Sequence, residues 1–590
     1  MRPFLLYNFP IIICLFGFFI NFASIYHLFY FILTDFMNLK LLFCSATVGL
    51  MVCSCFDDGY NLDDIDTTSR VDVKDLVIPI NFDAVKLSDI IKIEDDSAIK
   101  EISVNGKTIY AVSRTGDFDS DPIYIEAPSA DSPNLESKQA ALVGTDGIYV
   151  IPQTGNDFTF SCNNVDKSII DIYNVKVTPL EFTIQLNTPT VSASAAYDNV
   201  KIQLPKGMEG TATNGSYDTA TGVWTLSELP VTNGVAKAVL SVVYVDFTKN
   251  DFTFVNPKFE FNSNFSIIDG ELKVSGENQP SLIDFSVDFS LGKLEVTSFS
   301  GKIKYEIEGM DIETVSLNDL PSFLKGEDTN IELANPLICL QNTNPVAADK
   351  LTFSAGLSLA ALRDGVASNE ISSDIFTIGY DLGPNGMYNT VLAQSKPDYV
   401  PEKFSNYNYV EFKGLGSILS GKGLPQAISV NAVNPQLPEQ TVSDFELGRT
   451  ISGVHGSYEL FAPLSFTDNT SIIYSDTKDG WNKDIEDLVI DRLTLTATAT
   501  NETPLDAQLT IYPLGVDGNR LSGVSLTSNQ LKAGATAELT FTLQGEIKNL
   551  DGVEFFATVK AGSKETISPE QSIVFENIRV KVNGYYEKEL

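Results

Sequence analysis

The feature that most constrains this chain is an alternation of apolar and polar residues with a period of two. It is strictest over residues 284–291, where Phe, Val, Phe and Leu alternate with Asp and Ser. Successive side chains of a β-strand point to opposite faces, so this pattern predicts a strand with one buried face and one wet face. Similar alternation occurs at 182–186, 200–204, 539–543 and 578–582. We therefore expect a mostly β protein.

The connections between these segments favour antiparallel sheets. We expect a turn at Gly292-Lys293 and a further strand led in by Gly301, which together make an antiparallel meander over 284–307. Helical signals are short, at 87–91 and at 317–324, where Asn318 is expected to cap the helix. Many short strands separated by Gly, Pro and Asn predict tandem antiparallel β-sandwich domains of the immunoglobulin-like (Ig-like) type and disfavour a parallel α/β sheet.

Shifts in composition suggest where the modules of the chain begin and end. We expect an N-terminal β module at 71–179, β-sandwiches at 180–309 and 310–452, and a C-terminal β-sandwich at 453–590. An Asn-Pro pair recurs at 256–257, 335–336, 344–345 and 434–435, and a looser version runs from Asn501 to Pro504. These pairs are either a degenerate repeat of one sandwich corner or independent turns.

Residues 1–36 have the length and apolarity of a membrane span, with Arg2 and Asp35 as their charged residues. However, Phe, Ile, Leu, Tyr and Asn fill 25 of these 36 positions. Real membrane helices also use Gly, Ala and Val freely, so we interpret this segment as an extension upstream of the true start codon. The alternative is a genuine span or an extended signal.

A second start at Met37 fits export better. Residues 37–40 form a short basic region and 41–52 an apolar region of signal-peptide length. The sequence Val52-Cys53-Ser54-Cys55 at its end resembles the lipobox of bacterial lipoproteins. The resemblance implies that 37–54 is a lipoprotein signal peptide and that Cys55 becomes the lipidated first residue, which anchors the protein in a membrane. The alternative is an ordinary secretory signal that is cut elsewhere.

Residues 55–70 form an acidic tether without an apolar period. It resembles the export signal of Bacteroidetes-type surface lipoproteins, which implies a position in the outer membrane that faces the extracellular side. Phe56 departs from the small or basic residue that is usual there. The segments 317–340 and 458–513 also resemble uncharacterised multi-domain surface lipoproteins of this group. That resemblance implies a fold and a cellular location, and it implies no activity.

The charge and cysteine content exclude several classes of function. A net charge of −37 disfavours nucleic acid and anionic lipid as partners. Beyond Cys55 the remaining cysteines are Cys162 and Cys339, too few for a disulfide framework or a cysteine zinc site. Both lie in strand-like contexts, so we expect them to be buried apolar residues.

The sequence offers little for catalysis. Beyond residue 54 the one histidine is His455, and Ser457 is too close in sequence to make a usual triad with it. Residues 416–423 nearly spell a phosphate-binding loop, but Gly423 stands where the motif needs Ser or Thr, so we expect a flexible loop and no bound nucleotide. We therefore predict no catalytic residues and a protein that is not an enzyme. An unrecognised carboxylate pair is the alternative.

The most suggestive binding segment is the acidic run at 476–484. Within it, Trp481 is flanked by Asp479, Asn482 and Asp484, a combination that suits stacking against a sugar ring. The alternative is a Trp that packs over the end of a sandwich. Calcium is a candidate ion for this segment, although its spacing departs from an EF-hand, and we assign no metal site and no other cofactor.

The remaining aromatic residues divide into core and surface candidates. Trp224 lies in a strand-like context and is expected in the core. The run Tyr399, Tyr407 and Tyr409 is a second surface candidate.

These observations favour a non-catalytic, surface-exposed outer-membrane lipoprotein that acts in binding or adhesion, with a glycan or a surface protein as partner. A first alternative is a glycan-binding accessory lipoprotein of a polysaccharide uptake system, similar to the starch-binding lipoproteins. A second is a pilus subunit that resembles fimbrillins. Those precursors are cut after an arginine, for which Arg70 is the candidate, and residues 71–82 would then be exchanged between subunits as a strand.

Overall fold

The structure is a computed structural model. It describes residues 68–589 apart from 80–83, 95, 192–193, 277–278, 318–319, 327, 384, 486 and 564. The predictions for residues 1–36, the signal peptide 37–54, Cys55 and the tether up to residue 67 lie outside these residues. The chain divides into two units, one of Met1–Arg70 with Glu587–Leu590 and one of Val71–Tyr586. The second unit contains nearly all of the described residues.

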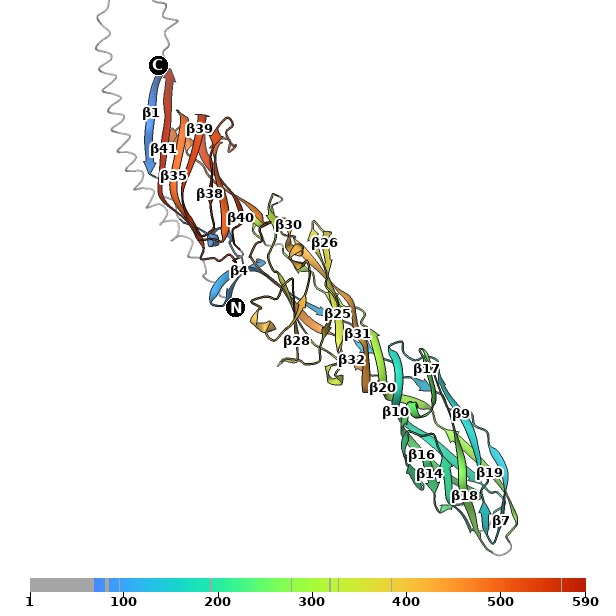
Figure 1. Ribbon diagram of the computed structural model, residues 1–590. Helices are drawn as coiled ribbons and strands as arrows, with labels where there is room; N and C mark the ends of the chain where they lie inside the picture. Colours follow the sequence, from blue (N-terminus) through green and yellow to red (C-terminus); the bar gives the residue numbers. More distant parts are fainter. Residues whose placement is uncertain are drawn as a thin grey trace, which may run out of the picture. The chain divides into compact units, whose positions relative to one another are not determined.

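Strands make up most of the described residues, and nearly all of them pair antiparallel (Figure 1). The pairing of β28 with β29 is parallel. The prediction of a mostly β protein is therefore confirmed, while the Ig-like assignment remains a prediction. Within the described residues, no helix has both the length and the apolar character needed to cross a bilayer.

One sheet joins the first strand to the C-terminal part of the chain, with β1 next to β41 at one edge. Its strands are β1 (Thr68–Pro79), β2 (Val85–Lys86), β35 (Leu488–Asn501), β37 (Ser525–Leu526), β39 (Thr536–Ile547) and β41 (Ser572–Glu589). A second sheet contains β23 (Asn330–Ile331), β30 (Gly421–Lys422), β34 (Ser471–Lys478), β36 (Leu505–Gly515), β38 (Ser528–Leu531) and β40 (Leu550–Ala561). Leu495 and Phe541 of the first sheet share one core with Ile511 and Val553 of the second, so the two sheets pack face to face.

A third sheet combines strands from both halves of the chain. Its strands are β3 (Ile99–Val104), β4 (Lys107–Asp119), β21 (Asp311–Ile312), β24 (Leu337–Asn342), β28 (Tyr388–Ala393), β29 (Asn408–Glu411) and β33 (His455–Pro463). A short ladder pairs β5 (Ile123–Tyr124) with β32 (Thr450–Ile451).

The most extensive network of paired strands occupies the middle of the chain. Its strands are β6 (Ser129–Ala130), β7 (Lys138–Thr145), β8 (Ile148–Val150), β9 (Thr154–Cys162), β10 (Ile169–Asn187), β11 (Ser194–Gln203), β12 (Met208–Ala212), β13 (Ser216–Asp218), β14 (Val223–Leu226), β15 (Leu229–Pro230), β16 (Val235–Asp246), β17 (Asp251–Val255), β18 (Lys258–Ser275), β19 (Leu282–Leu291), β20 (Leu294–Glu306), β22 (Val315–Ser316), β25 (Phe353–Arg363), β26 (Val366–Ser372), β27 (Phe376–Ile378) and β31 (Ala427–Glu446). Its core includes Phe158, whose ring contacts those of Phe160, Phe182, Phe261 and Phe265.

Helices are few and short among the described residues. They are α2 (Leu87–Ile90), α3 (Asn482–Ile485) and the 3-10 turns η2 (Phe247–Lys249), η3 (Ser322–Leu324), η4 (Ala347–Asp349), η5 (Glu402–Phe404) and η6 (Leu415–Leu419). The helix expected at 87–91 is present as α2. Of the helix expected at 317–324 the structure describes the turn η3, while the expected cap Asn318 lies outside the described residues.

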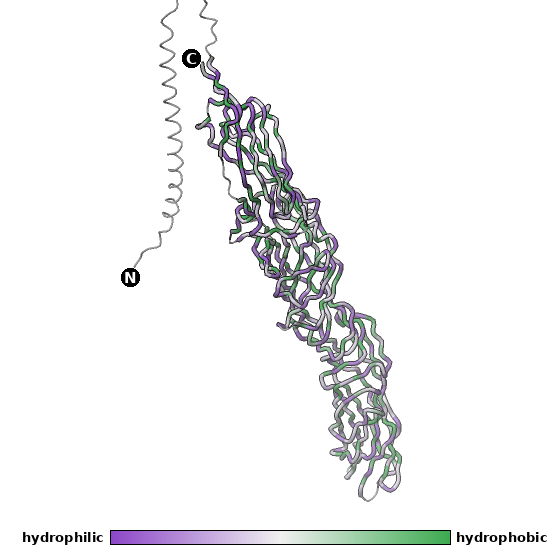
Figure 2. Tube along the Cα trace, turned by 60° about the vertical axis from the view of Figure 1, so that its left-hand side comes forward, coloured by the Kyte–Doolittle hydropathy of each residue, from purple (hydrophilic) through white to green (hydrophobic). Residues whose placement is uncertain are grey.

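The period-two pattern is confirmed where it is strictest. In β19 the apolar side chains Phe285, Val287 and Leu291 are buried, and the polar residues between them are partly or fully exposed. Figure 2 shows the same alternation as short hydrophobic and hydrophilic segments along the chain. One face of each such strand therefore carries the core, as the sequence predicts.

The meander expected over 284–307 is wrong. β19 and β20 pair with successive parts of β10 and run in the same direction, so the chain passes Gly292-Lys293 without the predicted turn. Gly301 does not start a new strand either, because β20 continues through it. A Cβ atom at Gly301 would clash with the carbonyl oxygen of Asp171, so the glycine permits a close approach of two strands.

Strand pairing does not follow the order of the chain. β4 pairs along its length with β33, and β20 pairs with β31. The predicted boundary at 179 falls inside β10, which pairs with strands on both sides of that position. Each sheet of the C-terminal and central regions thus takes strands from more than one of the predicted sequence segments.

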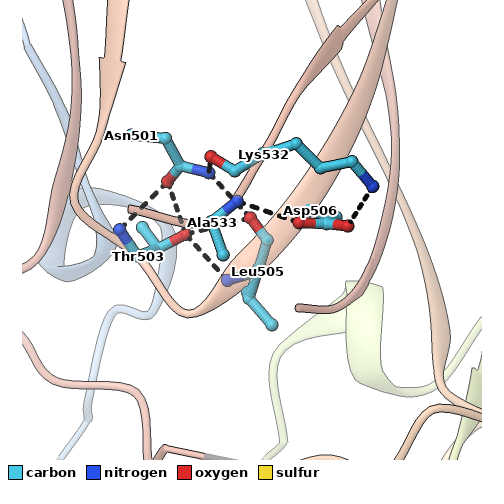
Figure 3. A network of polar contacts seen from close by, with 6 residues as sticks. All are labelled: Asn501, Thr503, Leu505, Asp506, Lys532 and Ala533. Atoms are coloured by element: carbon cyan, nitrogen blue, oxygen red, sulfur yellow. Dashed lines mark hydrogen bonds and ion pairs between the residues drawn. The ribbon is translucent and has the colours of Figure 1, made fainter. Parts of the chain in front are cut away.

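Asparagines hold several of the corners between strands; Asn344 and Asn501 are buried and Asn256 is exposed. The side-chain amides of Asn256, Asn344 and Asn501 each donate to two backbone carbonyls. In Asn344 and Asn501 the side-chain oxygen also accepts the backbone N–H two residues later. Figure 3 shows the corner at Asn501, where the carbonyls belong to Leu505 and Lys532. The full set of bonds is shared by Asn344 and Asn501, which favours one type of corner at these two positions. Asn335 bonds instead to Ser395, and Asn434 lies within β31, so the five predicted pairs do not share one corner.

Candidate functional site

The predicted binding segment around Trp481 connects β34 to β35. Its backbone is anchored to the start of β40, because the N–H of Trp481 donates to the carbonyl of Asp551 at 2.7 Å. The N–H of Asn482 donates to the Asp551 carboxylate at 3.0 Å. Gly480 has φ +88°, a left-handed conformation that glycine adopts without strain. The segment is therefore held at its C-terminal half and turns sharply before it.

The side chains of this segment lie in different environments. The Trp481 ring is half-buried and packs against the core shared by the two C-terminal sheets. Asp479 is exposed, Asn482 is half-buried, and Asp484 belongs to α3 with a side chain outside the described residues. Trp481 is thus at least partly a packing residue, and the sugar-stacking role stays a prediction.

The candidate calcium site stays a prediction as well. Among the residues that the structure describes, no group of three or more His, Cys, Asp or Glu side chains is placed to hold a metal ion.

Trp224 is in the core, as expected. It lies in β14 with 1% of its surface exposed, and its indole N–H donates to the carbonyl of Asn214 at 2.8 Å. Both cysteines are also buried, Cys162 at the end of β9 and Cys339 within β24. Burial raises the pKa of the Cys339 thiol to about 12, so this thiol stays protonated and unreactive.

His455 begins β33 at the surface. Its Nδ1 lies 3.5 Å from a carboxylate oxygen of Asp119 on the paired strand β4. Ser457 follows on β33 and pairs with Asp117 on β4. The absence of catalytic residues is a prediction that these positions leave untested.

The loop expected at 416–423 is ordered by packing, so the prediction of a flexible loop is wrong. Leu415, Ile418 and Leu419 of η6 are buried, and Lys422 in β30 pairs with Asn330. The guanidinium of Arg363 donates to the carbonyls of Ser420 and Lys422. The apolar residues between the glycines are buried and hold this segment in place. The high glycine content of the sequence had suggested flexibility instead.

The tyrosine run forms a cover over one face of the third sheet. Tyr399, Tyr407 and Tyr409 are partly buried against a cluster that includes Cys339 and Phe404. The rings of Tyr399 and Phe461 lie 5.7 Å apart. These tyrosines contribute apolar surface to the fold as well as to the exterior.

Sequence reasoning missed an exposed apolar patch, which consists of Val143, Ile148, Val150 and Leu282. Val143 of β7 lies opposite both Leu282 of β19 and Val150 of β8, so the three side chains share one face of the sheet. Ile148 is two residues from Val150 on the same strand and joins that face. Val143 and Val150 each remain 66% exposed.

Charged side chains border the apolar patch. Glu271 lies opposite Val150, and Asp284 is two residues from Leu282 on β19. Lys273, opposite Ile148, bridges Glu271 at 3.0 Å and Asp198 at 2.5 Å. The ion pair with Lys273 lowers the pKa of Asp198, so this carboxylate stays charged. The sequence signal for the patch was a run of apolar residues on both faces of the strands at 141–151.

A polar cleft of about 270 Å³ was also missed, because its residues are far apart in sequence. It forms where the turn after β4, the loop before β10 and the end of β20 meet, and it includes Tyr124, Asp166 and Tyr305. β10 and β20, which border it, are paired strands and lie beside each other in Figure 1.

Neither a protein-family model nor a curated protein matches this chain. Among solved structures, a protein of Parabacteroides distasonis described as a "putative secreted protein" is similar with a TM-score of 0.35 and 14% identity, covering 48% of this chain and 89% of that chain. An archaeal virus structure described by its triple jelly roll fold is similar with a TM-score of 0.11 and 12% identity, covering 78% of this chain and 90% of that chain.

Proposed function

We propose that this chain is the non-catalytic binding part of a lipoprotein that is anchored in the outer membrane, faces the outside, and adheres to a partner protein. The sequence around Cys55 supports the lipid anchor, and the acidic tether supports a location on the outer face of the membrane. The apolar patch on β7, β8 and β19 is the observation that carries the binding function. Exposed apolar groups with a polar rim are characteristic of protein interaction sites.

The charges at the rim indicate what kind of partner fits. Asp198, Glu271 and Asp284 outnumber Lys273, and the whole chain carries a net charge of −37. Two copies of this face would bring like charges together, which costs free energy. The fitting partner is therefore a protein surface with an apolar centre and a basic rim.

Photo-crosslinking from position 143 tests this function in cells that carry the full-length chain. A cross-linked partner is identified and purified, and its affinity is measured for the wild type and for the double variant Val143→Ser/Val150→Ser. We expect the double variant to weaken binding by about tenfold, and added salt to weaken wild-type binding. The matched control is Val366→Ser, which changes a similarly exposed valine on β26 outside the patch.

Two outcomes would contradict the proposal. One is a cross-link that joins position 143 only to a second copy of the chain. The other is a partner whose affinity is equal for the wild type and the double variant. The anchoring is tested separately with Cys55→Ala, which we expect to release the protein from the membrane fraction. A Cys55→Ala protein that remains in the membrane fraction would contradict the lipoprotein assignment.

A second candidate function is the pilus subunit, which the position of β1 favours. β1 is an edge strand that contains Arg70, and Val71, Leu76 and Val77 on it are exposed. An edge strand with exposed apolar side chains is the kind of strand that subunits exchange. N-terminal sequencing of surface material distinguishes the candidates, because a pilus subunit would begin at Val71 and the anchored lipoprotein at Cys55.

A further inference from the structure

The polar cleft has an excess of negative charge. Asp121, Asp166, Glu306 and Glu308 line it, and the one basic residue among its lining residues is Lys167. Lys167 lies 3.7 Å from Glu308, and both side chains are largely exposed. An ion pair in water contributes little, so the other three carboxylates keep their attraction for a cation.

One of these carboxylates is fixed in place by the backbone. The two oxygens of Asp166 accept the N–H groups of Ser168 at 2.8 Å and of Glu126 at 3.2 Å. Each carboxylate oxygen has a second lone pair available. Asp166 can therefore accept a further hydrogen bond from a ligand without rearranging.

Two kinds of uncharged group complete the lining. Ser168 is only 2% exposed, and its hydroxyl makes no hydrogen bond to any residue that the structure describes. This hydroxyl is not among the enclosed polar atoms that lack a partner, so it opens to the cleft, where a ligand can bond to it. Tyr124, which is half exposed, and Tyr305, which is partly buried, add aromatic surface from two different strands.

The size of the cleft limits what it can hold. Its volume of about 270 Å³ is far larger than the roughly 30 Å³ share of one water molecule. It is slightly smaller than the roughly 300–1,000 Å³ of sites for drug-sized ligands. The fitting ligand is therefore a molecule of about one ring.

We propose that this cleft binds an amino sugar, that is, a single hydroxylated ring that carries a primary ammonium group. The ammonium would pair with the carboxylates, and the ring hydroxyls would bond to Asp166 and Ser168. A sugar ring can also lay its C–H face on a tyrosine, while the ammonium gains from the negative face of an aromatic ring. This site is separate from the apolar patch and independent of the proposed adhesion.

Isothermal titration of the purified full-length protein with glucosamine tests the ligand class. N-acetylglucosamine and glucose are the matched probes, because each keeps the ring and loses the positive charge. We expect glucosamine to bind at least about tenfold more tightly than either, and its affinity to fall as NaCl is added. Equal affinities for the three sugars, or no heat with glucosamine, would overturn the proposal.

A second probe separates the sugar from a basic side chain of a peptide. N-acetyl-lysine amide carries a primary ammonium without the hydroxylated ring. We expect it to bind more weakly than glucosamine, since it cannot use the hydrogen bonds of Asp166 and Ser168. Tighter binding of the lysine derivative would assign the cleft to a peptide and refute the amino-sugar proposal.

Variants locate the binding in the cleft. Glu306→Gln removes one exposed charge, and we expect it to weaken glucosamine binding by about threefold while the affinity for glucose does not change. Tyr124→Ala should weaken the binding of both sugars, and Tyr380→Ala, at a similarly exposed tyrosine outside the cleft, should weaken neither. Circular dichroism confirms that each variant is folded. Unchanged glucosamine binding in folded Glu306→Gln and Tyr124→Ala would place the ligand elsewhere and overturn the proposal.

Discussion

The two tryptophans of this protein, Trp224 and Trp481, occupy opposite kinds of site. Trp224 is fully buried within β14, with its indole N–H bonded to the carbonyl of Asn214. Trp481 lies in the connection between β34 and β35, where the backbone is anchored by Asp551 and the ring is half-buried. One residue type thus serves as a core residue in one region and as a boundary residue in the other.

A binding residue needs a side chain that is not wholly enclosed by the fold. A side chain that is enclosed on all sides contributes its full apolar area to stability and has none left for a ligand. A half-buried ring contributes part of its area to the core and keeps part in contact with water. Trp481 therefore has surface available to a ligand, and Trp224 has none. Mutation and fluorescence can test this difference.

Trp224→Ala should have the largest effect. Loss of a fully buried indole leaves a cavity and an unpaired Asn214 carbonyl, so we expect the free energy of unfolding to fall by about 3–5 kcal/mol. Urea titration followed by circular dichroism measures this loss. Trp224→Phe, which retains an aromatic ring, serves as the control and should cost less. A loss under about 1 kcal/mol in Trp224→Ala would contradict the burial of this residue.

Fluorescence quenching should separate the two sites directly. In Trp224→Phe the remaining emission comes from Trp481, and in Trp481→Phe it comes from Trp224. We expect acrylamide to quench Trp481 severalfold more efficiently than Trp224, because only the former ring contacts solvent appreciably. Equal quenching constants in the two variants would remove the basis of the comparison.

Trp481→Ala should have a smaller effect on stability than Trp224→Ala. Because part of the ring already contacts water, we expect the free energy of unfolding of the protein to fall by about 1–2 kcal/mol. Thermal unfolding monitored by circular dichroism measures the change. A loss as large as that of Trp224→Ala would mean that Trp481 is a core residue and is not available to a ligand.

Asp551→Ala should have the smallest effect. It removes the hydrogen bond from the Asn482 N–H and keeps the one from the Trp481 N–H, which goes to the backbone carbonyl of residue 551. We expect a loss of about 0.5–1.5 kcal/mol and faster amide exchange at Asn482, measured by hydrogen exchange. Unchanged exchange at Asn482 would show that the Asp551 carboxylate does not hold this segment.

Local pattern was a reliable guide to single strands. The strict alternation at 284–291 predicted both the strand β19 and its buried face, because a period of two has one structural interpretation. Trp224 and the two cysteines were placed correctly for the same reason, since each lies among residues with strand preference.

Glycine was a less reliable guide, because it has more than one structural use. The sequence suggested a strand start at Gly301 and a flexible loop at 416–423. In the structure Gly301 allows two strands to approach closely, and the 416–423 segment is ordered by its buried apolar residues. A glycine permits a turn and equally permits tight packing, and its neighbours in space decide which occurs.

The mostly β character, the strict strands and the burial of Trp224 follow from local sequence, because they depend on each residue and its near neighbours. The pairing of β4 with β33, the exposed face at Val143 and Val150, and the cleft at Asp166 arise only when the whole chain folds. Pairing between distant strands depends on how all strands pack together, and no local pattern records that arrangement. Both surfaces that we propose for binding belong to this second class.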